Sequence, residues 1–191
     1  MSRYWVADLS RRGGKNHGSG EGSDRTAAGM ERRAAEELAM AEVNRVVVHH
    51  ADGRVVKGTT ADFLPSRAAF HLQPLTGHGT ILIQLAALKA VFFVKDFRGN
   101  PRRSETQHFL DSPAESTHGK KVAVRFRDGE ILLGYTISYS PERGGFFVHP
   151  ADEHGNNLRI YIVAGATVEV HTGPAADTAA QKMLSIHGGH A

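Results

Sequence analysis

Short runs of β-branched and aromatic residues, separated by turns containing Gly, Pro or Asp, recur along most of the chain. In two places Asp-Gly stands between two such runs, as VVVHHADGRVVKG from Val46 and VAVRFRDGEILLG from Val122. Asp-Gly between apolar runs is the strongest short-range signal for a β-hairpin. Further strands are expected at AFHLQP, TILIQL and KAVFFV, and at GFFVHP, NLRIYIV and ATVEV. The pattern predicts a mainly β protein with five short antiparallel strands in each part.

The two parts align without a gap when the sequence is shifted so that Val46 lies on Val122 and Val94 lies on Val170. Fifteen of the 49 aligned positions are identical, which predicts a tandem duplication of one unit. Gly58 and Gly134 are among the identities and fall inside the second strand of each unit. A glycine there predicts a sharp bend, or a place where a Cβ would clash.

The segments outside the strands give the expected domain boundaries. Residues 1–25 are rich in Gly, Ser, Arg and His and are predicted to be disordered. A helix is expected over 26–43, so that 26–97 would hold this helix and the first barrel. Residues 98–120 form the expected linker, 121–171 the second barrel, and 172–191 a tail with a short amphipathic helix.

The pattern V-x-V-x-x-x-D-G-x-V-x-x-G, followed by Phe or Tyr and a third strand ending in F-x-L/V, resembles the Sm-like small barrel. That family begins with a helix and folds into a bent five-stranded sheet. The resemblance covers residues 30–95 well and 121–170 moderately. It implies two tandem five-stranded small barrels, of the Sm/SH3-like kind, with an N-terminal helix. The two-repeat form also looks like an uncharacterised bacterial family.

Sm-like proteins characteristically bind RNA through an Asp-x-x-x-Asn element after the second strand and an Arg-Gly element before the last strand. Asp62 stands near the first position, but Arg67 and Ala68 stand where the Asn is sought. Ser138 replaces the Asp in the second unit, and the Arg-Gly element is missing from both units. The resemblance therefore implies the fold without its RNA site.

Composition excludes several kinds of chemistry. The chain of 191 residues has no Cys, which excludes disulfides, thiolate metal sites and cysteine nucleophiles. His49 and His50 are adjacent in a strand and point to opposite faces, so neither a metal site nor a cofactor is expected. Ser104, Ser112 and Ser116 have no framed His–carboxylate partner, and an enzyme is not expected.

The charge and the apolar runs indicate where the protein acts. The net charge of +3 is spread along the chain, without the dense Lys/Arg stripe of a non-specific nucleic-acid binder. The longest apolar stretches are too short for a membrane helix, and the N-terminus has no signal-peptide core. A soluble, cytoplasmic protein with no membrane contact is expected.

Two sets of residues are candidates for binding. Arg67 and Arg143 each follow a turn proline by two positions and are present in both units, as a duplicated anion or carboxylate contact or as solvated turn residues. Phe63 and Tyr139, the aromatic residues after the second strands, complete the candidate ligand-binding set.

The second set is a candidate protein interface. Phe92 and Phe93 occupy successive positions of the fifth strand, so both faces of that strand must be covered. Phe97 adds a ring close by, and a contact between the two units is predicted there. The alternative is cover by a terminal amphipathic helix. Trp5, in an apolar cluster near the N-terminus, is a candidate docking residue.

Together these features predict a non-enzymatic tandem-barrel binding or adaptor module with a regulatory role and a protein partner in a bacterial-type cytoplasm. RNA or single-stranded nucleic-acid binding is the first alternative, and binding of a cyclic dinucleotide or another small anionic ligand is the second. The sequence leaves the oligomeric state open.

Overall fold

The first half of the folded region contains five strands with one turn of 3₁₀ helix before the last. These elements of the computed structural model are β1 (Asn44–His50), β2 (Val55–Thr60), β3 (Ala69–Pro74), β4 (Ile81–Gln84), η1 (Leu85–Ala87) and β5 (Leu88–Val94). The predicted β1–β2 hairpin is confirmed. The Asp52 carboxylate accepts a hydrogen bond from the Arg54 N–H at 3.1 Å, and Gly53 has a φ of 88°, which favours glycine.

The second half has the same order of elements and ends in a helix. Its elements are β6 (Glu115–Ser116), β7 (Gly119–Phe126), β8 (Ile131–Thr136), β9 (Gly145–Pro150), β10 (Asn157–Val163), η2 (Ala164–Ala166), β11 (Thr167–Thr172) and α2 (Pro174–His187). The β7–β8 hairpin is closed in the same way, by Asp128 and by Gly129 with a φ of 89°. Helix α2 confirms the short C-terminal helix that the sequence predicts.

The structure describes residues 43–99, 115–116, 118–152 and 154–187. The predicted disordered segment 1–25, the helix expected over 26–43 and most of the linker lie outside these ranges, as does Trp5.

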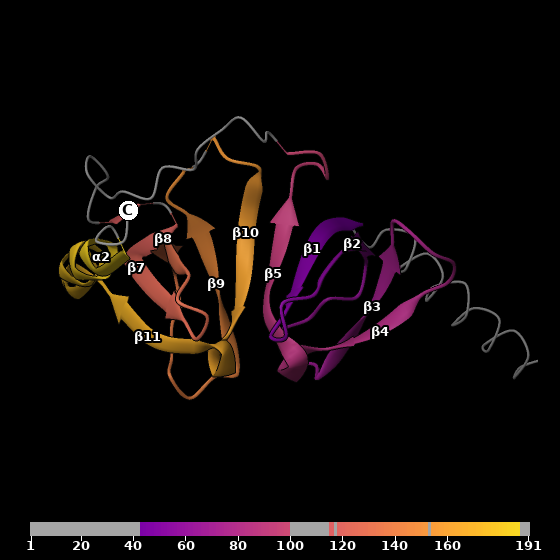
Figure 1. Ribbon diagram of the computed structural model, residues 1–191, viewed down its shortest axis with the longest axis horizontal. Helices are drawn as coiled ribbons and strands as arrows, with labels where there is room; N and C mark the ends of the chain where they lie inside the picture. The colour runs from indigo at the N-terminus through magenta and orange to yellow at the C-terminus, as the bar shows by residue number, and fades with distance from the viewer. Residues whose placement is uncertain (1–42, 100–114, 117, 153, 188–191) are drawn as a thin grey trace, which may run out of the picture. The chain divides into compact units, whose positions relative to one another are not determined.

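The strands form one open antiparallel sheet, and the prediction of two separate closed barrels is wrong. The strand order is β11-β7-β8-β9-β10-β5-β1-β2-β3-β4, with β6 paired to β7 at the side (Figure 1). Closing the first half would require β5 to pair with β4. Instead, β5 pairs with β10 of the second half, with Val91 opposite Tyr161. Strand β4 is therefore left at the end of the sheet.

The two halves correspond element by element, but with a change of offset that the ungapped alignment misses. Strands β2 and β8 begin at Val55 and Ile131, which are partners in that alignment. The turns η1 and η2 begin at Leu85 and Ala164, whereas the alignment places Leu85 on Tyr161. The second half therefore has three more residues between the end of its third strand and its 3₁₀ turn, and β10 is longer than β4. Identities beyond this turn, such as Ala90 with Ala166, do not occupy equivalent places.

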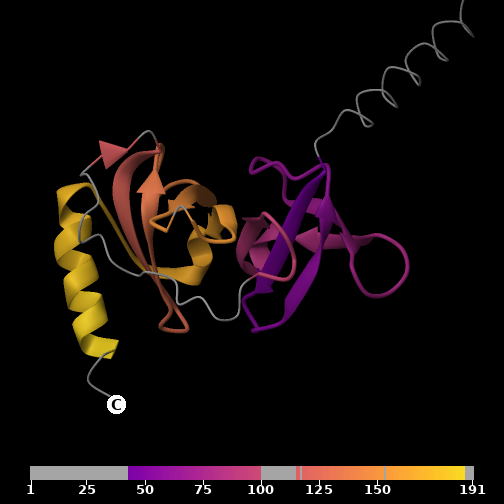
Figure 2. The ribbon, with the colours of Figure 1, turned by 90° about the horizontal axis from the view of Figure 1, so that it is seen from above.

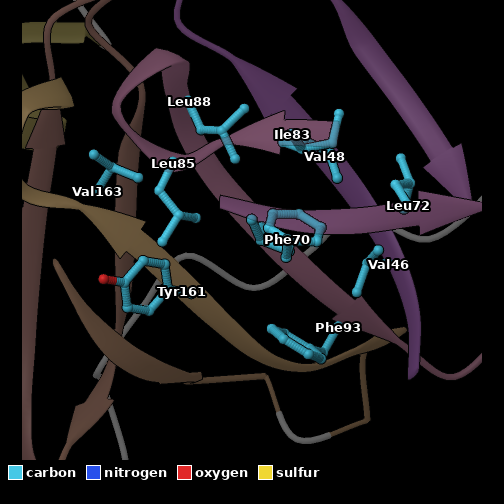
Figure 3. Packing of buried hydrophobic residues seen from close by; sticks show 11 residues of the cluster. Val46, Val48, Phe70, Leu72, Ile83, Leu85, Leu88, Phe93, Tyr161 and Val163 are labelled. Atoms are coloured by element: carbon cyan, nitrogen blue, oxygen red, sulfur yellow. The ribbon is translucent and has the colours of Figure 1, made fainter. Parts of the chain in front are cut away.

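Each half has its own core, and each core also contains residues of the other half. The first core combines residues of β1, β3, β4, η1 and β5 with two residues of β10, Tyr161 and Val163 (Figure 3). The second core combines residues of β7, β9 and β10 with three residues of β5, Ala90, Phe92 and Val94.

Strand β5 is buried at all seven positions because it lies between these two cores. Phe93 points into the first core, Phe92 points into the second, and Phe97 packs on the second from outside the strand. The sequence predicts that something outside the first half buries Phe92 or Phe93. Phe92 lies in the second core, and Phe93 packs with Tyr161 of β10 in the first. Helix α2 does not cover these rings, because α2 packs elsewhere.

Helix α2 covers the outer face of the second half (Figure 2). The third cluster is made of sheet residues that point away from the second core and of mostly small helix residues: Ala123, Ile131, Leu133, Ala176, Ala179, Ala180 and Met183. Lys121 extends the contact with an ion pair of 2.8 Å to Asp177 near the helix N-terminus.

The glycines predicted to bend the second strands are required for space. A Cβ on Gly58 would overlap the Gln73 carbonyl oxygen, and one on Gly134 would overlap the carbonyl oxygen of His149. Neither contact is sterically allowed. At these points β2 crosses β3, and β8 crosses β9, with backbone against backbone.

We expect Gly134→Ala to destabilise the fold by about 1–3 kcal/mol, because the added methyl group must displace backbone atoms. Thermal melting followed by circular dichroism measures this, with Gly144→Ala as the matched control. A Cβ on Gly144 meets no atom within 4 Å, so the control should melt like the wild type. Equal melting temperatures for the two variants would contradict the close approach of β8 and β9.

Candidate binding surfaces

The two aromatic residues of the candidate ligand-binding set are half-buried and pack against the cores. The Phe63 ring lies 5.2 Å from the rings of both Phe93 and Tyr161, and 6.2 Å from that of Phe147. It therefore joins the first half to β9 and β10. Tyr139 holds the corresponding position in the second half, with its ring 4.8 Å from that of Phe146. Each ring thus contacts the core of its half and keeps part of its surface exposed.

Arg67 and Arg143 are exposed and belong to equivalent turns. The Arg67 N–H donates to the Leu64 carbonyl at 3.0 Å, and the Arg143 N–H donates to the Ser140 carbonyl at 3.2 Å. These bonds close the turns that contain the two prolines. The backbone of each arginine is thus held by a turn of its own half.

Asp62, the residue nearest to the RNA-binding position of the Sm-like pattern, holds a loop in place. Its carboxylate accepts hydrogen bonds from the His71 N–H at 2.9 Å and from the Thr60 hydroxyl at 3.2 Å, and lies 2.8 Å from the His71 ring nitrogen. Burial alone would raise the pKa of Asp62, but these hydrogen bonds lower it below its usual value. The carboxylate is occupied in fixing the β2–β3 connection.

Lys89 is buried in β5 and binds two carboxylates of the other half. Its ammonium donates to Asp128 and Glu130 in the β7–β8 hairpin, and lies 4.6 Å from the centre of the Phe126 ring. Burial alone would lower the pKa of Lys89, but the hydrogen bonds to the two carboxylates raise it. The interaction ties the hairpin of the second half to the strand of the first.

The same interaction sets the ionisation of Asp128. Burial alone would raise the pKa of its carboxyl group, but the hydrogen bonds from the Lys89 ammonium and the Glu130 N–H hold it below its usual value. His49, whose ring lies 4.5 Å from that of Phe92, is close to this group, and burial lowers its pKa. Neutral His49 and ionised Asp128 are therefore the forms expected near pH 7.

Of the two terminal strands of the sheet, β4 and β11, β4 exposes more apolar side chains. Ile81 and Leu82 are 38% and 56% exposed, and Ile83 points into the first core. β4 pairs only with β3, from Ala69 opposite Gln84 to Leu72 opposite Ile81. Its other edge has no strand beside it in the described residues. This surface is not among those predicted from the sequence. The three successive apolar residues Ile81, Leu82 and Ile83 indicate it, because one face of this strand is exposed to solvent.

A second surface is a basic pocket of about 460 Å³ beside the junction of the two halves. The Arg159 guanidinium lies over the rings of Phe93 and Phe147, at 4.6 and 5.1 Å from their centres. The rings of His118 and His149 are stacked 4.2 Å apart. Burial, and then the neighbouring His118 and Arg159, lower the pKa of His149. None of the described residues that line the pocket is Asp or Glu.

The basic pocket could not be predicted from sequence spacing. His118 precedes β7, His149 lies in β9 and Arg159 lies in β10, so only the fold brings these side chains together. Among the described residues, no group of three or more His, Asp or Glu side chains is placed to hold a metal ion. In the same part of the chain no helix has the length and apolarity needed to cross a membrane.

Comparison with protein families matches residues 42–172 to a family of unknown function, DUF6982. The chain belongs to this family. The matched region runs from just before β1 to the end of β11, so the DUF6982 region comprises both halves of the sheet and leaves out α2. No curated protein and no solved structure matches the chain.

The Lys89 interaction in this DUF6982 protein predicts a pH-dependent stability. Because the folded pKa of Asp128 is below the unfolded one, the stabilisation is present at neutral pH and is lost as the pH falls through the folded pKa. We expect the melting temperature of Lys89→Met to fall less between pH 7 and pH 3 than that of the wild type. Lys57→Met removes the same charge from an ammonium that donates to a carbonyl, and should keep the wild-type slope. Parallel curves for all three proteins would show that the interaction contributes nothing.

Proposed function

We propose that this DUF6982 protein is a non-enzymatic binding module in which the free edge of β4 receives an extended segment of a protein partner. The exposed Ile81 and Leu82 on a terminal strand are the observation that carries the proposal. A strand edge offers N–H and C=O groups in a row, and a peptide that pairs with them places alternate side chains against the sheet.

The sequence of β4 supports this use of its edge. Proteins protect exposed edge strands with lysine, proline or bulges, because an unprotected apolar edge pairs with other chains. The strand Ile81–Gln84 is short, at four residues, but it contains neither lysine nor proline and has a regular register with β3. An edge left in this state fits a surface that is covered by a partner.

We also infer that the two halves are copies of one unit, as the sequence alignment indicates. The support is the common strand order, in which the fifth strand lies beside the first and the fourth does not close on the fifth, together with the matching order of the elements. The resemblance of each half to the Sm-like strand pattern is proposed on the same basis. An adaptor role follows if the ends of this doubled sheet bind different segments.

Selection of peptides from a displayed random library tests the strand-addition proposal. Selected peptides are expected to carry apolar residues at alternate positions and to bind the wild type more tightly than Leu82→Lys. Burying a Leu side chain contributes about 1.5–3 kcal/mol, so the substitution should raise the Kd at least about tenfold.

Ile137→Lys is the control, because Ile137 is 76% exposed and lies in the turn after β8. It introduces the same charge and should leave peptide binding unchanged. Peptides that bind Leu82→Lys as tightly as the wild type, or a library that yields none, would exclude β4 as the receiving edge.

Single-stranded nucleic acid is the second candidate ligand, and the basic pocket is the observation that favours it. The flat Arg159 guanidinium and the stacked His118–His149 pair offer planar surfaces for bases, and Arg159 and Lys95 supply positive charge for phosphates. Release of counterions would make such binding fall steeply as salt is raised.

Fluorescence anisotropy with a labelled single-stranded oligouridine tests this candidate. Arg159→Gln is expected to weaken binding and to flatten its salt dependence, whereas Arg143→Gln, an exposed arginine outside the pocket, should bind like the wild type. Equal losses in the two variants would mean that the pocket has no part in binding.

A further inference from the structure

The two ends of the sheet correspond to the two strands that meet at its centre. In the middle, the fifth strand of the first half, β5, pairs with the fourth strand of the second half, β10 (Figure 1). The strands at the ends are the fourth strand of the first half, β4, and the fifth strand of the second half, β11. The two terminal strands of the sheet, β4 and β11, are thus a fourth and a fifth strand, like the two strands that pair at its centre.

The central joint also defines a register for a pairing between chains. Val91 lies opposite Tyr161, and Phe92 lies opposite Ile160. When η1 is superposed on η2, the corresponding pairs are Val170 with Leu82 and His171 with Ile81. Val170 already packs on the second core, so an incoming Leu82 would extend that core across the joint.

Helix α2 lies beside the strand that such a pairing would use. On β7, Ala123 is covered by α2, whereas the equivalent residue on β1, Val47, packs on the second core. The outer face of β1 is thus covered by the second half, and the equivalent face of β7 is covered by helix α2. Next to it the face of β11 is polar, with Glu169 bound to Arg125 and 3.5 Å from His171.

The attachment of α2 is of a kind that can be released. Over residues 174–185, whose burial the structure describes, the buried side chains are Ala176, Ala179, Ala180 and Met183, and Leu184 is half-buried beside them. A groove of about 710 Å³ remains between the helix and β11, lined by Arg125, Glu169 and His171 on the side of the sheet. Small side chains bury little apolar area, and the stabilisation from docking them is correspondingly small.

We propose that α2 caps the β11 end of the sheet, and that its release lets β11 of one chain pair with β4 of a second copy, with Val170 opposite Leu82. Such a contact joins different surfaces of the two copies and is heterologous, so it continues head to tail. This inference rests on the proposed function of β4 as a receiving edge, and it names a second copy as the partner.

Sedimentation velocity of the full-length chain tests the cap. The variant Ala179→Glu/Met183→Glu places two charges in the helix contact, and the control Gln181→Glu/Ser185→Glu places two on exposed helix positions. The wild type and the control are expected to be monomeric, and the first variant to form oligomers that grow with concentration. Adding Leu82→Lys to that variant should restore the monomer.

Disulfide trapping tests the register, since the chain has no cysteine of its own. In the released variant, Leu82→Cys with Val170→Cys should give a ladder of linked chains under mild oxidation. Leu82→Cys with Val168→Cys, two residues out of register, should link poorly, because disulfides require Cα atoms about 4.4–6.8 Å apart. The milder Met183→Ala should raise the linking rate of the matched pair even if the doubly charged helix does not fold.

Several outcomes would overturn the proposal. A wild type that assembles without release of α2, a released variant that melts cooperatively yet stays monomeric, or equal linking by the two cysteine pairs would each do so. Oligomers that Leu82→Lys leaves intact would mean association through the uncovered face of β7 and β8. If peptides bind β4 in the wild type while no assembly occurs, only the second-copy partner fails; if neither is seen, both proposals fail.

Discussion

The pairing of β5 with β10 is the interaction on which the rest of the structure depends. These strands form a wall with a core on each side, and every residue of β5 is buried. Successive side chains on a strand point to opposite faces, so Phe92 and Phe93 belong to different cores. Neither core is complete without the wall, and the halves therefore cannot separate as independent barrels without exposing both.

The wall also explains why the sheet is open. Because β10 pairs with the second edge of β5, β5 cannot also pair with β4 to close the first half into a barrel. Strand β4 therefore remains at the end of the sheet. At the other end, β11 lies beside α2, whose small side chains cover the outer face of β7 and β8. The described part of the chain thus has two unlike ends, one apolar and bare, the other polar and partly covered.

Local features of the fold were predictable, and the pairing of distant strands was not. The Asp-Gly hairpins follow from backbone preferences, and the need for Gly58 and Gly134 follows from their place inside a strand. The pattern of Phe92 and Phe93 correctly required cover on both faces. It did not say which strand supplies that cover, because a strand edge pairs through backbone groups that every residue has. For the same reason the packing of Phe63 against Phe93 and Tyr161 does not follow from the sequence pattern.

The specificity of the joint resides in its polar members. Apolar strands pair in many registers, and a slip of one residue would exchange the two cores. Lys89 opposes such a slip, because its buried ammonium must reach Asp128 and Glu130 in the opposite hairpin. A register that left this ammonium without its carboxylates would bury an unpaired charge, at a cost of several kcal/mol. The equivalent position in β11 is Val168, which is exposed. The central joint thus has an ionic interaction for which β11, in the described part of the chain, has no equivalent at this position. A contact made at that end of the sheet would therefore be weaker than the joint within the chain.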